Sequence, residues 1–102
     1  MRTRPMGQVY FLRAGDDGPI KIGYTTGSVW IRVSALQQSA PDKLNWLGAY
    51  IAPPEEERRL HKLFSAHRRR AEWFEPHFSV LSYIGSMCPD FNQDEYLEYY
   101  FR

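Results

Sequence analysis

Two β-type segments, Gln8-Val-Tyr-Phe-Leu-Arg13 and Ile20-Lys-Ile-Gly-Tyr24, flank a dense cluster of turn-forming residues, Ala14-Gly-Asp-Asp-Gly-Pro19. β-branched and aromatic side chains dominate the first segment, and in the second two isoleucines alternate with Lys21. This order of strand, Asp-Gly turn and strand predicts a β-hairpin. Because successive strand residues point to opposite faces, we expect Lys21 on the face opposite the two isoleucines.

A short helix and a further strand are predicted after the hairpin. Apolar residues recur at i, i+4 and i+7 from Val29, behind the hydroxyl side chains of Thr25-Thr-Gly-Ser28. This spacing predicts an amphipathic helix over 28–38. The apolar segment 44–51 predicts a third strand that pairs with the hairpin.

A second helix begins in Pro53-Pro-Glu-Glu-Glu57, where proline suits the first turn and the carboxylates complement the positive end of the helix dipole. Downstream, 72–74 has the pattern of a short extended piece and the apolar segment 78–87 that of a third helix. The acidic, aromatic segment 90–102 is interpreted as a last helix or a tail. The inward stripe of the second helix is expected to consist of Leu60, Leu63, Phe64 and His67.

The composition excludes several classes of protein. At 102 residues and 12.0 kDa, with 43% hydrophobic residues, the chain has the size of one α+β domain with its own core. Cys88 is the only cysteine, so neither an internal disulfide nor a CxxC zinc site is expected. No apolar run approaches the ~20 residues of a membrane span, and the basic N-terminus lacks the apolar region of a signal peptide. We therefore expect a cytoplasmic protein with no membrane partner.

The charge is distributed unevenly along the chain. Residues 1–70 carry 12 basic and 6 acidic side chains, whereas residues 71–102 carry 1 basic and 6 acidic ones. A basic body with an acidic tail is typical of a nucleic-acid-binding protein whose tail serves solubility or a partner. Surface charge without a binding role is the alternative, and the charge pattern alone does not separate the two.

Six short motifs follow one another in a recognisable order. They are Val9-Tyr-Phe11, Ile20-Lys-Ile-Gly-Tyr-Thr25, Arg32 with Leu36, Leu44 with Leu47, Glu57-x-x-Leu-His-x-x-Phe64, and Arg68-Arg-Arg-Ala-Glu-Trp-Phe74. In this order and spacing the chain resembles the GIY-YIG nuclease superfamily, in the short stand-alone branch common in phages and bacteria. The resemblance covers residues 8–76, and 77–102 lie outside it as a helical, acidic and aromatic extension of the same single domain, 1–102.

The resemblance implies a fold and an activity. The fold is a three-stranded antiparallel sheet flanked by helices within an α+β domain. The activity is metal-dependent endonucleolytic hydrolysis of phosphodiester bonds, with DNA as the substrate and RNA as the alternative. Such chemistry must deprotonate a water, stabilise extra negative charge in the transition state and neutralise the departing oxygen.

The same resemblance implies roles for particular residues. Tyr10 would lie beside the attacking water, and Lys21, which replaces the second-motif tyrosine, would act as general base if nearby cations depress its pKa. Arg32 would hold phosphate oxygens through its planar guanidinium. Glu57 would bind Mg²⁺ or Mn²⁺, since one carboxylate with several waters suits these ions. The fallback candidates for the proton acceptor are Tyr24 and His61.

Each of these residues also has a purely structural interpretation. Tyr10 fits a half-buried strand aromatic, and His61 fits the edge of the core. Glu57 fits a helix-dipole carboxylate as well as Glu55 or Glu56 does, which leaves the metal-ligand assignment open by a residue. Glu72 is expected to pair with an arginine from 68–70.

Exposed cations suggest the partner. We expect sequence-independent contacts to the nucleic-acid backbone from Arg58, Arg59, His67, Arg68, Arg69 and Arg70. A second hypothesis is a binding module on the same fold that grips nucleic acid without cleaving it. A third is a protein-interaction factor that docks through its acidic, aromatic tail, 96–101.

Overall fold

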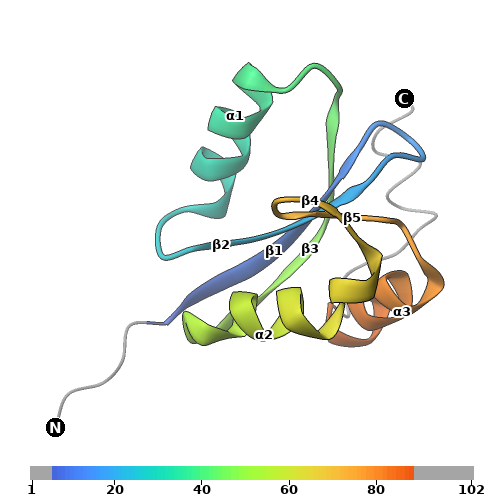
Figure 1. Ribbon diagram of the computed structural model, residues 1–102. Coiled ribbons are helices and arrows are strands. Elements are labelled where there is room, and N and C mark those ends of the chain that lie inside the picture. Colours follow the sequence, from blue (N-terminus) through green and yellow to red (C-terminus); the bar gives the residue numbers. More distant parts are fainter. Residues whose placement is uncertain (1–5, 89–102) are drawn as a thin grey trace, which may run out of the picture.

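The computed structural model describes residues 6–88, which form three α-helices, one 3₁₀ helix and five strands (Figure 1). The chain is therefore an α+β protein with an antiparallel sheet, as the sequence predicts. The predicted segment 90–102 lies outside the described residues. In chain order the elements are β1 (Gly7–Ala14), β2 (Ile20–Thr25), α1 (Val29–Ser39), β3 (Leu44–Ala52), α2 (Glu55–Leu63), η1 (Ser65–His67), β4 (Arg68–Arg70), β5 (Trp73–Phe74) and α3 (Phe78–Met87).

The sheet has five strands in the order β3-β1-β2-β5-β4, so the expectation of three strands is wrong. The two additional strands form a tight hairpin, and β5 pairs with β2 at Ile20 and Lys21 only. Strands of two or three residues are too short to display the alternating pattern that identifies a strand in a sequence. Ala71, in the turn of this hairpin, has a φ of 51°, a conformation that favours glycine.

The helices lie on both faces of the sheet (Figure 1). Alternate residues of β1 point to opposite faces, and the larger core contains Val9 and Phe11 with residues of α2 and α3. Tyr10 and Leu12 point to the other face and pack with Val29 of α1. The sheet is thus covered by α1 on one side and by α2 and α3 on the other.

The predicted helices form close to their expected limits. The Ser28 hydroxyl caps α1 by accepting a hydrogen bond from the Ile31 amide, as expected for a helix that starts after hydroxyl side chains. In α2 the inward side chains are Leu60 and, just after the helix, Phe64, whereas Leu63 is 55% exposed. The predicted stripe is wrong at Leu63, because Leu60 and Phe64, one helical turn apart, already fill the contact with the sheet. Among residues 6–88, no helix has the length and apolarity needed to cross a membrane.

Candidate active site

The α1 face of the hairpin carries the first two predicted site residues. Tyr10 lies opposite Gly23 in the β1–β2 ladder, and Lys21 lies opposite Leu12, two residues further along the same face. Both side chains are almost completely buried, with Tyr10 1% and Lys21 7% exposed. A Cβ atom at Gly23 would lie 2.3 Å from the Cζ atom of Tyr10, so the absence of a side chain there lets the phenol lie flat across β2.

Arg32 reaches this face from α1. It donates a hydrogen bond to the Tyr10 hydroxyl, and this contact is the main reason that the pKa of Arg32 is raised. The carboxylates of Glu72 and Glu57 raise it further through their negative charge. Arg32 therefore interacts with the phenol on β1 and with two carboxylates from other parts of the chain.

Lys21 is held by a carboxylate. Its ammonium group donates to an Oε atom of Glu72 at 2.5 Å and lies 5.6 Å from the centre of the Trp73 ring. Glu72 therefore pairs with Lys21, and the expectation that it pairs with an arginine from 68–70 is wrong. The reason is the β4–β5 turn, which places Glu72 beside β2, where the Glu72 carbonyl also accepts from the Ile22 amide at 3.0 Å.

Glu57 is the member of the glutamate triplet that faces the site. Burial is the main cause of its raised pKa, and the negative charge of Glu72 adds to it, while His61, Lys21 and Arg32 act in the opposite direction. Glu57 is thus electrostatically coupled to the groups from β2, α1 and the β4–β5 turn. Glu57 reaches these groups because β5 pairs with β2 only as far as Lys21, and α2 contacts the remainder of β2.

Glu56 faces away from this cluster and has a structural role. Its carboxylate accepts from the Tyr50 hydroxyl at 2.8 Å and from Arg59, which also donates to the Tyr83 hydroxyl at 2.9 Å. These bonds join α2 to β3 and to α3. They lower the pKa of Glu56, chiefly through Arg59. The rotation of α2, which packing decides, therefore turns Glu56 towards β3 and α3.

His61 lies one helical turn after Glu57 and is oriented by the edge of β2. Its Nε2 atom is 3.0 Å from the carbonyl oxygen of Ile22, and its ring contacts Phe74 edge-on, with centroids 5.1 Å apart. Since a carbonyl oxygen only accepts, Nε2 carries the proton. In the neutral imidazole this leaves Nδ1 as an acceptor.

Tyr24 is the predicted site residue that the structure does not bring to the cluster. It is paired with Val9, packs against the larger core on the opposite face of the sheet, and donates its hydroxyl proton to the Ala52 carbonyl at 2.9 Å. The residue before it, Gly23, faces Tyr10. Tyr24 is therefore on the wrong face to accept a proton near Lys21, because adjacent strand residues alternate between faces.

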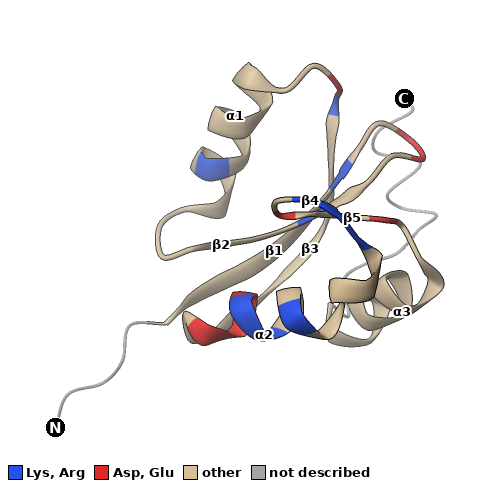
Figure 2. Cartoon of the chain, in the orientation of Figure 1, with Lys and Arg blue, Asp and Glu red and all other residues tan. Residues whose placement is uncertain are grey.

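The cations expected to contact nucleic acid differ in their contacts. Arg59 and Arg69 are already paired, with Glu56 and Glu75 respectively. His67 stacks on His77, with ring centroids 3.8 Å apart. The arginines of this set lie in α2 and along β4 (Figure 2). The exposed members of the set are Arg58, Arg59, Arg68, Arg69 and Arg70, and Arg68 also donates to the Ala71 carbonyl.

Glu57 is the carboxylate of the cluster that could hold a metal ion. Within residues 6–88, no group of three or more His, Cys, Asp or Glu side chains converges to hold a metal ion. Glu57 alone nevertheless has the features of a single-carboxylate site, because burial and the neighbouring Glu72 carboxylate both disfavour its unneutralised charge. One carboxylate supplemented by waters is an arrangement that Mg²⁺ accepts.

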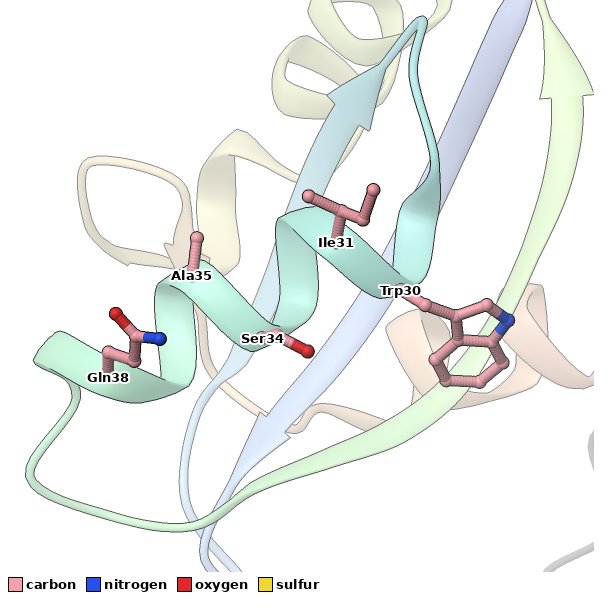
Figure 3. Close-up of a pocket in the computed structure, with 5 residues that line it drawn as sticks. All are labelled: Trp30, Ile31, Ser34, Ala35 and Gln38. Carbon is pink, nitrogen blue, oxygen red and sulfur yellow. The ribbon is translucent and has the colours of Figure 1, made fainter.

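A separate shallow depression lies on the outer side of α1 (Figure 3). Trp30 and Ile31 there are 63% and 73% exposed, and the Trp30 ring lies 4.8 Å from that of Trp46 on β3. The depression is lined by Trp30, Ile31, Ser34, Ala35 and Gln38, none of which is ionisable. It has no group that could transfer a proton or hold a phosphate by charge, so we do not assign chemistry to it.

Sequence reasoning missed Glu72 as a member of the cluster. The only signal was its place in the Glu72-Trp73-Phe74 motif, from which the sequence predicts a short extended piece and a local ion pair. Phe74 is buried, but Glu72 forms an ion pair with Lys21, which lies 51 positions earlier in the chain.

Comparison with known proteins gives one match. The T5orf172 domain, a phage-associated domain, matches residues 7–87, which include every element described above. No curated protein and no solved structure matches the chain.

Proposed function

Because the chain belongs to the T5orf172 domain family, we propose that it is a nuclease of the GIY-YIG kind, a metal-dependent endonuclease that hydrolyses phosphodiester bonds of DNA. The observation that carries this proposal is the meeting of four elements at the open edge of β2. There the guanidinium of Arg32 interacts with the hydroxyl of Tyr10 and, through its charge, with the carboxylate of Glu57. Lys21 and His61 complete the cluster.

The two cations would stabilise the transition state. Hydrolysis places additional negative charge on the phosphate oxygens, and donors already in place around these oxygens lower the barrier because they need no reorganisation. Arg32 is exposed and carries a planar guanidinium, whereas Lys21 is buried in the sheet. Together they would hold one phosphate from two directions.

Tyr10 would act as a hydrogen-bond donor. Its oxygen accepts a hydrogen bond from Arg32, and a hydroxyl has one donor proton besides its acceptor sites. The proton of Tyr10 would therefore point to a phosphate oxygen or to the attacking water. Because the ring is buried against Gly23, its position is set before substrate binds.

His61 would accept the proton of the attacking water. The Ile22 carbonyl orients the ring and fixes the proton on Nε2, so Nδ1 is the nitrogen that takes up a proton in the reaction. Lys21 is less suited to this task, because its ammonium group already donates to Glu72. We therefore favour His61 as the base and assign Lys21 an electrostatic role.

Glu57 would hold the divalent ion. When Mg²⁺ or Mn²⁺ is bound, it supplies Lewis-acid stabilisation of the phosphate and of the leaving oxygen. Arg58, Arg68 and Arg70 would contact neighbouring phosphates of the DNA backbone, so that binding weakens steeply with salt.

A plasmid-nicking assay with Mg²⁺ or Mn²⁺ tests the proposal. Arg32→Ala, Glu57→Ala and His61→Ala should each lose most of the activity, because each removes a group from the cluster. Lys62→Ala is the matched control, since it removes an exposed cation from the same helix as Glu57. Equal nicking by all variants would disprove the assignment of the site. Salt-dependent DNA binding by the wild type without any metal-dependent product would instead favour the binding-module hypothesis.

A further inference from the structure

The ion pair between Lys21 and Glu72 joins two side chains with very different freedom to move. The Lys21 side chain is 9% exposed and is anchored in β2, between β1 and β5. The Glu72 side chain is 40% exposed and belongs to the turn between β4 and β5. A rotation of the Glu72 side chain towards solvent would therefore separate the pair without moving the sheet.

The Glu72 backbone is fixed although its carboxylate is not. The Ile22 amide donates to the Glu72 carbonyl at 3.0 Å, which holds the turn against the edge of β2. Any displacement of the carboxylate therefore involves the side chain alone. Such a motion needs only rotamer changes, which are fast in exposed side chains.

The carboxylate of Glu72 interacts with both cations that would bind a phosphate. It is hydrogen-bonded to Lys21, and its negative charge raises the pKa of Arg32. It also raises the pKa of Glu57, so it lies close to the side chain that would bind the metal. A negatively charged group in contact with Lys21 and close to Arg32 has the electrostatic character of a phosphate oxygen.

We propose that Glu72 is an internal counter-ion that occupies the phosphate position on Lys21 in the free protein and is displaced by a phosphodiester oxygen when nucleic acid binds. The proposal rests on the proposed function, because it takes Lys21 and Arg32 as the phosphate-binding groups. Glu72 would keep the buried ammonium paired before substrate arrives, since an unpaired buried charge is costly. It would also reject weakly bound anions, because a ligand must displace a carboxylate to enter.

Binding measured without metal tests this proposal. The affinity of a short fluorescent DNA duplex is measured in EDTA by anisotropy for the wild type and for Glu72→Gln. Loss of the competing carboxylate should tighten binding by about two- to five-fold, the size expected for a partly exposed ion pair. Glu72→Asp, which keeps the charge, should remain close to the wild type. Asp16→Asn is the control for net charge, because it removes an exposed carboxylate in the turn between β1 and β2.

A double-mutant cycle shows whether the effect passes through Lys21. In a Lys21→Met background, Glu72→Gln should change the affinity by much less than in the wild type. A titration with inorganic phosphate, followed by the NMR signals of the Lys21 side chain, should give the same order of affinities as DNA. Agreement between the two ligands would assign the competition to the phosphate group itself.

Several results would overturn the proposal that Glu72 is an internal counter-ion. These are unchanged or weaker binding by Glu72→Gln, an equal gain in Asp16→Asn, a gain that persists in Lys21→Met, a gain with DNA but not with phosphate, and no measurable binding of either ligand. The nicking assay separates this proposal from the proposed function. Tighter binding by Glu72→Gln in a protein that does not nick would refute only the nuclease, and nicking without any change in binding would refute only the counter-ion.

Discussion

Replacing Gly23 with alanine should damage the fold and the candidate site together. The new Cβ atom would lie 2.3 Å from Cζ and 2.5 Å from the hydroxyl oxygen of Tyr10. Non-bonded carbon atoms pack at roughly 3.5–4.0 Å, so the ring must retreat by roughly 1–2 Å. Tyr10 is 1% exposed and has no open space to retreat into, so the ring displacement must push on its neighbours.

The magnitude follows from this overlap. Inserting a methyl group into a packed core costs about 1–3 kcal/mol of the free energy of unfolding. For a domain of this size, each kcal/mol lowers the melting temperature by about 4–8 °C. Because the hydroxyl of Tyr10 moves with its ring, nicking activity should fall by on the order of 100-fold, the usual consequence of a misplacement of about 1 Å.

Gly85→Ala is the matched control for this experiment. It makes the same chemical change inside α3, where nothing lies within 4 Å of the new Cβ atom. Alanine in a helix interior is more stable than glycine by about 0.5–1 kcal/mol, so this variant should melt higher than the wild type. Thermal unfolding followed by circular dichroism measures both. A Gly23→Ala variant that melts at the wild-type temperature and retains its nicking rate would refute the packing argument.

The remaining predictions concern charge, hydrogen bonding and backbone strain. The pKa of Glu57 is raised in the folded protein, so folding favours the protonated carboxyl group. The contribution of Glu57 to the free energy of unfolding is therefore full below pH 4.5 and is lost as the pH rises through the pKa of the folded protein. Glu57→Gln should therefore melt higher than the wild type at neutral pH, and a lower melting temperature there would contradict this sign. Tyr24→Phe should lose about 0.5–1.5 kcal/mol of stability, because it loses the hydrogen bond to the Ala52 carbonyl, but it should keep the wild-type nicking rate. A large loss of activity in the folded variant would show that Tyr24 takes part in the reaction. Ala71→Gly should stabilise the protein by about 0.5–1 kcal/mol in chemical denaturation, because the strain of the positive φ that glycine removes exceeds the entropic cost of glycine. A destabilised variant would show that the turn is not strained.

The regular elements could be predicted from the sequence because each carries its own local signal. β-branched and aromatic residues predict β1, and the alternation around Lys21 predicts β2. The spacing that starts at Val29 predicts α1, which the structure places at Val29–Ser39. The family resemblance that the short motifs carry implies a common site for Tyr10, Arg32 and Glu57. The structure brings these three groups into contact or electrostatic range.

Other features depend on contacts between distant parts of the chain. Lys21 and Glu72 are 51 residues apart, and β5 has only two residues, too few to show a strand pattern in the sequence. Local sequence patterns do not predict such contacts, because they indicate which residues are apolar but not which segments of the chain pack together.

The sequence by itself determined which side chains are available for chemistry and which elements carry them, since residue type and periodicity are local properties. Only the tertiary structure decided that Glu57 faces the cluster while Glu56 joins α2 to β3, that Tyr24 points to the opposite face of the sheet, and that Glu72 holds Lys21. The physical reason is that packing sets the rotation of α2 and the approach of the β4–β5 turn to the edge of β2. Burial in the two cores fixes both, and no single segment contains that information.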